Sequence, residues 1–392
     1  MSDTISEGLR VRIASGPAGG AAGAEKLPRR FWGMTSRQRL ERAVARASGA
    51  PAPDGAVVGA VLVRDDFIFD EMLLPALLRT PGVVLTDAGG EPVAAHLLDP
   101  AGADAAEGAL AAGDGAALAP ELRRVDSAGL ASTYNKSLRR RAPPYLMRID
   151  SLPPVAIERR MYDGAYKGVT DFVTKRLWPW PAFHVTRFCA RFGISPNVVT
   201  TVSLILVLAA MWLFWNGQFA PGLACAWGMC FLDTVDGKLA RVTLRSTPFG
   251  NIFDHGIDLI HPPFWYWAWY HGLVAANYGL SDSLLSLSLL IVIVGYVAGR
   301  LQEGLFTWLH GIEIHIWRPV DSWFREITAR RNPNLFILTL AVILGSPREG
   351  FVAVAIWTLV SFTFHTIRIL QASLAKAMGH APVSWLREPI KP

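Results

Sequence analysis

Residues 233–258 read DTVDGKLARVTLRSTPFGNIFDHGID and lie within long apolar surroundings. The stretch carries four carboxylates, on Asp233, Asp236, Asp254 and Asp258. If both halves of the stretch are helical, the first two aspartates share one face of one helix and the last two share one face of the next. A charge at bilayer depth costs a few kcal/mol or more, so acids in such a place are expected to be functional. The sequence therefore predicts two neighbouring membrane helices that each present an acidic stripe.

Four converging carboxylates repel one another unless cations neutralise them. Oxygen-only ligands suit hard ions such as Mg²⁺ or Mn²⁺, and four shared carboxylates suit two ions about 4 Å apart. Such two-metal sites commonly serve phosphate chemistry. Gly237 and Ala240 leave one helix face bare for a bulky ligand, and Arg241 offers a fork of donors to a phosphate.

The pattern D-x-x-D-G-x-x-A-R, eight residues, G-x-x-x-D-x-x-x-D resembles the signature of the CDP-alcohol phosphotransferase family. Its eight fixed positions are Asp233, Asp236, Gly237, Ala240, Arg241, Gly250, Asp254 and Asp258. The resemblance implies that Asp233, Asp236 and Asp254 ligate two Mg²⁺ (or Mn²⁺) ions per active site. It implies that Asp258 is shared between the second metal and the role of general base. It also implies a CDP site at Gly237, Ala240, Arg241 and Gly250, and a homodimer.

A second element, SPNVVT at 195–200, is similar to the P-N-x-x-T element that lies beside the nucleotide in this family. The resemblance assigns Asn197 and Thr200 to the CDP site. The alternative interpretation is a helix start with a capping Asn and a Thr that bonds back to the helix. For the acceptor we consider Lys238, which is otherwise a cytoplasmic anchor, and Arg300, which otherwise faces the bundle or snorkels.

The chain has 392 residues, of which 51% are hydrophobic, and the apolar runs of membrane-spanning length all follow residue 196. We expect six spans of about 20 residues. They cover roughly 197–215, 221–240, 251–271, 283–303, 334–344 with flanks, and 351–374. The formal net charge is +6, but the basic residues gather at the ends of apolar segments, which favours membrane orientation over nucleic-acid binding. Their distribution predicts cytoplasmic termini and a cytoplasmic acidic motif in the inner membrane.

The chain before the membrane part reads as several segments. Residues 1–34 are expected to be a flexible tail, 35–133 a small α/β domain, 134–169 a basic linker and 170–192 an interfacial helix. Residues 193–380 form the predicted all-α polytopic domain, and 381–392 a second tail. The α/β domain resembles part of a nucleotidyltransferase domain fused to some inositol-using family members. Because the Gly-rich phosphate loop is missing, we interpret it as degenerate. Asp65 and Asp66 are either remnant metal ligands or a solvated turn.

These observations predict an integral membrane enzyme. By its resemblance it transfers a phosphatidyl or phospho-polyol group from a CDP-alcohol to an acceptor hydroxyl and releases CMP, in phospholipid or inositol-containing lipid synthesis. Membrane lipids are its expected surroundings. The alternatives are a divalent-cation carrier and a catalytically silent scaffold. An arginine beside the acids has no evident use in a cation path, and no motif acid is lost as a silent scaffold would allow.

Overall fold

A computed structural model describes residues 4–6, 9–16, 29–48, 59–118, 120–276 and 283–387. The chain divides into two compact units. The first comprises Met1–Tyr166, Ala190–Phe192 and Arg241–Leu244, and the second comprises Lys167–Cys189, Gly193–Ala240 and Arg245–Pro392.

The first unit is built on a mixed six-stranded sheet in the order β1-β2-β5-β8-β7-β9. Strands β2 and β5 run parallel, as do β7 and β9, and the other neighbouring pairs are antiparallel. The strands are β1 (Thr4–Ser6), β2 (Leu9–Ala14), β5 (Gly59–Arg64), β7 (Val83–Thr86), β8 (Pro92–Leu97) and β9 (Arg123–Val125). Shorter strands are β3 (Arg30–Phe31), β4 (Met34–Thr35), β6 (Phe67–Phe69), β10 (Tyr134–Asn135), β11 (Arg140–Arg141) and β12 (Leu146–Arg148).

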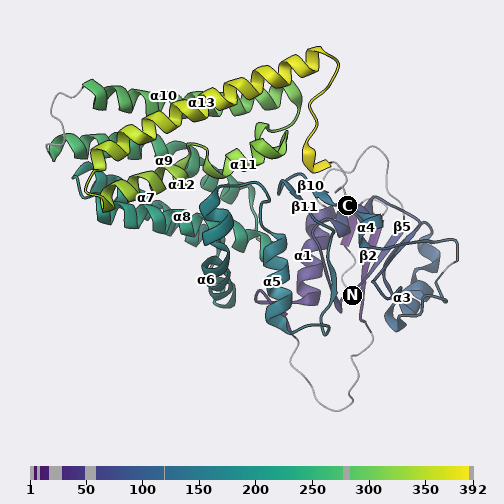
Figure 1. The fold of residues 1–392 in the computed structure, drawn as a ribbon. Helices are drawn as coiled ribbons and strands as arrows, with labels where there is room; N and C mark the ends of the chain where they lie inside the picture. Colours follow the sequence, from purple (N-terminus) through teal and green to yellow (C-terminus); the bar gives the residue numbers. More distant parts are fainter. Residues whose placement is uncertain are drawn as a thin grey trace. The chain divides into compact units, whose positions relative to one another are not determined.

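Helices cover both faces of this sheet, and α1 and α3 lie on opposite sides of it (Figure 1). Successive residues of a strand point to opposite faces. Val61 and Val63 accordingly pack in one core with α1 and α2, whereas Ala60 and Leu62 pack in another with α3. The helices are α1 (Ser36–Ser48), α2 (Leu73–Leu78), α3 (Ala103–Ala112), α4 (Ser127–Leu130) and α5 (Pro154–Gly164), with a 3₁₀ turn η1 (Pro100–Gly102). The structure thus contains the expected N-terminal α/β region.

Two segments of this unit differ from the sequence-based expectation. The predicted flexible tail contains β2, because Leu9 and Val11 alternate with arginines and bury one face against the sheet. The predicted linker contains α5, which begins with Pro154 at its first turn and buries Ile157 and Met161, one helical turn apart. Most of the remaining predicted tail, at 17–28, lies outside the described residues.

The acidic pair after β5 is bound within the unit. Both Asp66 carboxylate oxygens accept hydrogen bonds from the buried Arg64, at 2.9 and 2.6 Å. Asp65 accepts from the Gly16 backbone N–H at 3.2 Å and lies 3.5 Å from Arg37. Because these carboxylates already have cationic or N–H partners, the structure gives the pair a role in holding the unit together.

The second unit is helical. Its helices are α6 (Pro179–Arg191), α7 (Pro196–Trp215), α8 (Phe219–Val242), α9 (Pro248–Ala275), α10 (Ser283–His310), α11 (Pro319–Ile327), α12 (Arg331–Ile343) and α13 (Pro347–Ala377). The last two residues of α6 and of α8 are counted with the first unit. Short turns are η2 (Val173–Leu177), η3 (Ile314–Ile316) and η4 (Trp385–Arg387). The predicted interfacial helix at 170–192 is divided into the π-helical η2 and the α-helical α6, between which Pro179 starts a new helix.

Three described helices, α7, α10 and α13, are long and apolar enough to cross a membrane. The protein is therefore a multi-pass membrane protein. Helices also occupy the positions of the other predicted spans, but α12 has 13 residues and a length of about 20 Å, against a hydrocarbon core of about 30 Å. The count of six spans stays a prediction.

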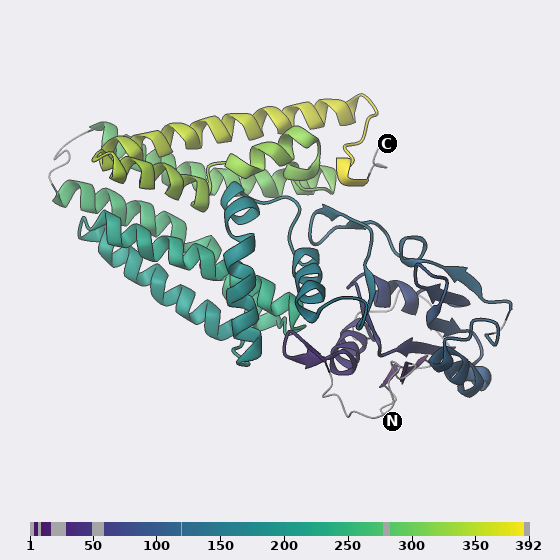
Figure 2. The same cartoon turned by 60° about the horizontal axis from the view of Figure 1, so that its bottom comes forward.

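The long helices pack as a bundle (Figures 1 and 2), with α7 against α9, α9 against α10, and α13 against both α10 and α12. Its core includes Phe214 of α7, Met229 of α8, Trp269 of α9 and Phe351 of α13. This packing fixes α8 and α9, the two helices that carry the acidic motif.

Candidate active site

The four motif aspartates are presented by the facing helices α8 and α9. Asp233 and Asp236 lie on α8, and Asp254 and Asp258 on α9. One carboxylate oxygen from each of Asp233, Asp236 and Asp254 lies within 4.8 Å of the other two. The expected convergence of acids from two helices is therefore present in the structure.

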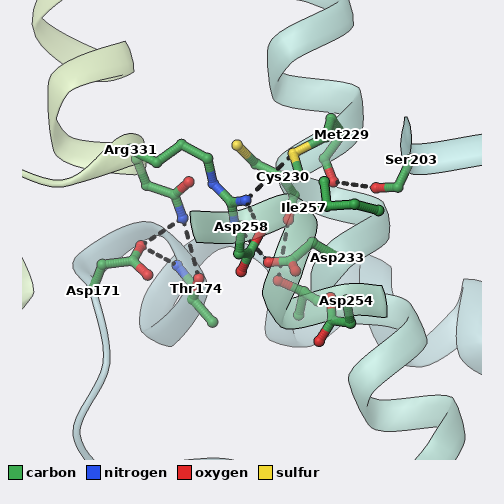
Figure 3. A network of polar contacts seen from close by, with 12 residues as sticks. Asp171, Thr174, Ser203, Met229, Cys230, Asp233, Asp254, Ile257, Asp258 and Arg331 are labelled. Atoms are coloured by element: carbon green, nitrogen blue, oxygen red, sulfur yellow. Dashed lines mark hydrogen bonds and ion pairs between the residues drawn. The ribbon is translucent and has the colours of Figure 1, made fainter. Parts of the chain in front are cut away.

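Arg331, the first residue of α12, reaches into this acidic cluster (Figure 3). Its Nη2 donates to Asp233 Oδ2 at 2.6 Å, and its Nη1 donates to Asp258 Oδ1. The Arg331 side chain is 15% exposed, and those of Asp233 and Asp258 are 19% and 39% exposed. The guanidinium thus supplies part of the positive charge that four carboxylates require.

The start of α7 contacts the same site. Thr200 Oγ1 donates to Asp236 Oδ2 at 2.6 Å and also contacts the Pro196 carbonyl at 3.1 Å. Asn197 approaches α9 closely, since a Cβ added at Gly250 would lie 2.7 Å from Asn197 Oδ1. Both polar residues of the P-N-x-x-T element therefore adjoin the acidic motif, and Gly250 is the residue that permits the approach of Asn197.

The start of α9 is fixed by its own cap. Thr247 Oγ1 accepts a hydrogen bond from the Gly250 N–H at 3.0 Å, and Pro248 occupies the first turn, where its missing N–H is harmless. This cap fixes the start of α9, about two turns before Asp254.

The donor set fits a hard divalent cation. Asp236 is 3% exposed, and its Oδ1 is a buried acceptor with no hydrogen-bond partner among the described residues. A buried carboxylate oxygen without a partner is costly, and a metal ion would satisfy it. Asp233, Asp236 and Asp254 are therefore the residues that would hold such an ion.

The residues at the start of α12 contact three separate parts of the unit. Arg330 binds Glu303 of α10, Arg331 binds the motif acids, and Asn332 Nδ2 donates to Asp171 Oδ1 at 2.9 Å. Burial opposes ionisation of Asp171, but the Arg325 charge and the hydrogen bonds from Thr174 and Asn332 outweigh it and lower the pKa of Asp171. These contacts fix the start of α12 and thereby direct Arg331 towards α8 and α9.

The remaining predicted residues have varied surroundings. Gly237 and Ala240 are half-buried on α8, and Arg241 is half-buried in its last turn. Lys238 is 3% exposed, so the structure does not present it as an open acceptor site.

The Arg300 guanidinium lies 3.5 Å from Glu303 and 5.2 Å from the centre of the Tyr296 ring, whose hydroxyl donates to the Leu259 carbonyl at 2.9 Å. A single aromatic side chain therefore separates Arg300 from the backbone next to Asp258.

Comparison with known sequences agrees with this geometry. Residues 193–364 match the sequence model of the CDP-alcohol phosphatidyltransferase family. This part of the chain is similar to CDP-alcohol phosphatidyltransferases. The match covers α7 to α12 and most of α13, so it includes the four aspartates, the P-N-x-x-T element and Arg331.

Two curated proteins are similar to part of this chain. Archaetidylinositol phosphate synthase of Pyrococcus horikoshii is 35% identical over 79 residues, which are 20% of this chain and 42% of that protein. Human cholinephosphotransferase 1 is 29% identical over 163 residues, 40% of this chain and 35% of that protein. The chain thus spans less than half the length of either relative. The crystal structure of phosphatidylinositol phosphate synthase from Mycobacterium tuberculosis, in its apo form, aligns with a TM-score of 0.37 and 19% identity, covering 48% of this chain and 95% of that one.

Arg331 is the site residue that sequence reasoning missed, because it reads as one of the basic residues at the ends of apolar segments. A signal for it was present. Four carboxylates require cations, and the adjacent Arg330 and Arg331 stand immediately before the fifth apolar segment.

Proposed function

We propose that this protein is a metal-dependent CDP-alcohol phosphotransferase of the membrane. The observation that carries the proposal is the convergence of Asp233, Asp236 and Asp254 beside Thr200, within a region that matches the family. A cation carrier or a silent scaffold has no need for the P-N-x-x-T element to adjoin the acids.

In the proposed reaction, an acceptor hydroxyl loses its proton and its oxygen attacks the alcohol-bearing phosphorus of the CDP-alcohol. A new phosphate ester bond forms, the bond from that phosphorus to the CMP oxygen breaks, and CMP leaves with the electron pair. Bound divalent ions, held by Asp233, Asp236 and Asp254, would neutralise the pyrophosphate and the charge that develops on CMP.

Asp258 is the proposed general base. Arg331 binds only its Oδ1, and the side chain is 39% exposed, so an acceptor hydroxyl can approach the carboxylate. Gly237, Ala240, Arg241, Gly250 and Asn197 form the proposed CDP site. Gly250 and Asn197 support this assignment because they lie against each other at the start of α9.

The substrates proposed at this stage are a CDP-alcohol and an alcohol or polyol acceptor in membrane-lipid synthesis. They are either CDP-diacylglycerol with a polyol or polyol phosphate, or a soluble CDP-polyol with a lipid or inositol-phosphate acceptor. We further propose a homodimer in the inner membrane, with both termini and the site on the cytoplasmic side. The basic loops predicted from the sequence support this orientation.

The experiment is CMP release by the purified protein with Mg²⁺ and a panel of CDP-alcohols and acceptors. We expect Asp258→Asn to abolish CMP release while CDP binding, measured by calorimetry, is largely retained. Asp150→Asn serves as the matched control, because Asp150 pairs with Arg148 in the other unit. Folded protein that releases no CMP with any pair of substrates contradicts the proposal.

A further inference from the structure

An apolar cavity of about 440 Å³ lies between α7 and α9 in the second unit. Leu204, Leu208 and Met211 of α7 line one side, and Ile260 and Phe264 of α9 line the other. Its volume is within the range of about 300–1,000 Å³ that small-molecule pockets occupy. Because α7 is apolar and long enough to span the membrane, the cavity adjoins hydrocarbon and not water.

The cavity reaches the face of α9 that carries the motif acids. Its wall includes Ile257 and His261, and His261 lies three residues after Asp258, on the same face of the helix. The wall is open at Gly256, since no heavy atom outside its own neighbourhood lies within 4 Å of a Cβ added there. A narrow chain can therefore lie in the cavity with its end near Asp258.

One polar group in the wall lacks a partner. His261 is 5% exposed, its Nδ1 lies 2.6 Å from the Ile257 carbonyl, and its Nε2 is buried with no hydrogen-bond partner among the described residues. A carbonyl only accepts, so Nδ1 carries the proton in the neutral imidazole and Nε2 is an acceptor. An acceptor in an otherwise apolar cavity fits a ligand that combines a hydrocarbon chain with a hydroxyl group.

We propose that this cavity binds the acyl chain of a lipid alcohol, with the hydroxyl end at His261 and Asp258. The inference rests on the proposed function and assigns the lipid to the acceptor. A diacylglycerol esterified to CDP has no free hydroxyl to donate to His261, whereas a lipid alcohol has one.

The first test measures binding and does not depend on turnover. The protein in lipid nanodiscs is irradiated with a diacylglycerol that carries a diazirine at mid-chain, and the labelled peptides are identified by mass spectrometry. We expect labels in residues 204–211 and 252–264, and a loss of most labelling in Gly256→Leu, which fills the cavity. Gly299→Leu on α10 is the matched control, because its added Cβ also meets open space. Labels confined to other helices overturn the proposal, as does labelling that Gly256→Leu leaves unchanged.

The second test uses CMP release with a soluble CDP-alcohol. For Leu208→Trp we expect the KM for dioleoylglycerol to rise roughly tenfold, because the larger side chain would exclude about two methylenes of the acyl chain from the cavity. The KM for dibutyrylglycerol, whose chains are short, should stay unchanged. Leu290→Trp is the control, since the two leucines are 54% and 59% exposed. Equal effects on both lipids, or a chain-length effect on CDP-diacylglycerol instead, overturn the assignment to the acceptor. CMP release that needs only soluble acceptors overturns it too and leaves the proposed function standing.

Discussion

Replacing Arg331 by glutamine should strengthen binding of a divalent cation. In the structure the guanidinium donates to Asp233 and Asp258, so it competes with a metal for the same carboxylates. A hydrogen bond between charged groups contributes about 1.5–3 kcal/mol, and the half-exposed Asp258 contact adds little because solvent screens it. Counting only the Asp233 contact, Arg331→Gln should raise the affinity for Mn²⁺ about 10- to 100-fold.

The measurement is calorimetric titration of Mn²⁺ into the purified protein in nanodiscs, with electron paramagnetic resonance of bound Mn²⁺ as a second readout. Arg348→Gln is the matched control, because Arg348 pairs with Glu349 at the start of α13 and does not contact the acids. A folded Arg331→Gln protein that binds Mn²⁺ no more tightly than the wild type would refute the reasoning. The guanidinium would then be a partner of the metal site and not its competitor.

Three further predictions concern the proposed CDP site and the stability of each unit. Gly250→Ala should weaken CDP binding roughly fivefold, because the new Cβ would lie 2.7 Å from an amide oxygen of α7; Gly299→Ala, in open space, should have no effect. Asp321→Asn should cost about 3–5 kcal/mol of stability, seen as earlier thermal unfolding, because it leaves the buried Arg368 without its ion-pair partner; a cost below about 1 kcal/mol contradicts this. Burial lowers the pKa of His96 below its usual value of 6.5, so the unfolded chain takes up the proton before the folded chain does as the pH falls. The stability of the first unit should therefore be full above about pH 6.5 and should fall as the pH drops through that value. Hydrogen-exchange protection of β8 should show this loss, and His96→Gln should abolish it.

Sequence reasoning succeeded where the signal is local. The four aspartates repeat at helical spacing within apolar segments, and this pattern predicted both the two helices and the face on which the acids meet. The P-N-x-x-T element was equally readable, although only the structure shows Thr200 bonded to Asp236.

The rest depends on contacts between distant residues or on weak local patterns. Arg331 meets Asp258 across 73 residues of chain, and nothing in the local sequence distinguishes it from Arg330. Strand β2 was obscured by the Gly- and Ala-rich stretch that follows it, although its alternation of apolar residues and arginines is visible over six positions. Helix α5 was obscured because the prolines before it read as a break, whereas Pro154 starts the helix.

The way α12 begins also has a consequence for biosynthesis. Ribosomes release a chain from its N-terminus onwards, so α8 and α9 enter the membrane before Arg331, Arg330 and Asn332 have been translated. During that interval the motif acids lack the cation that α12 later provides. A nascent chain that ends before α12 should therefore depend on divalent ions or on the insertion machinery to keep its acidic helices in place, and it should be degraded faster than one that has passed residue 332.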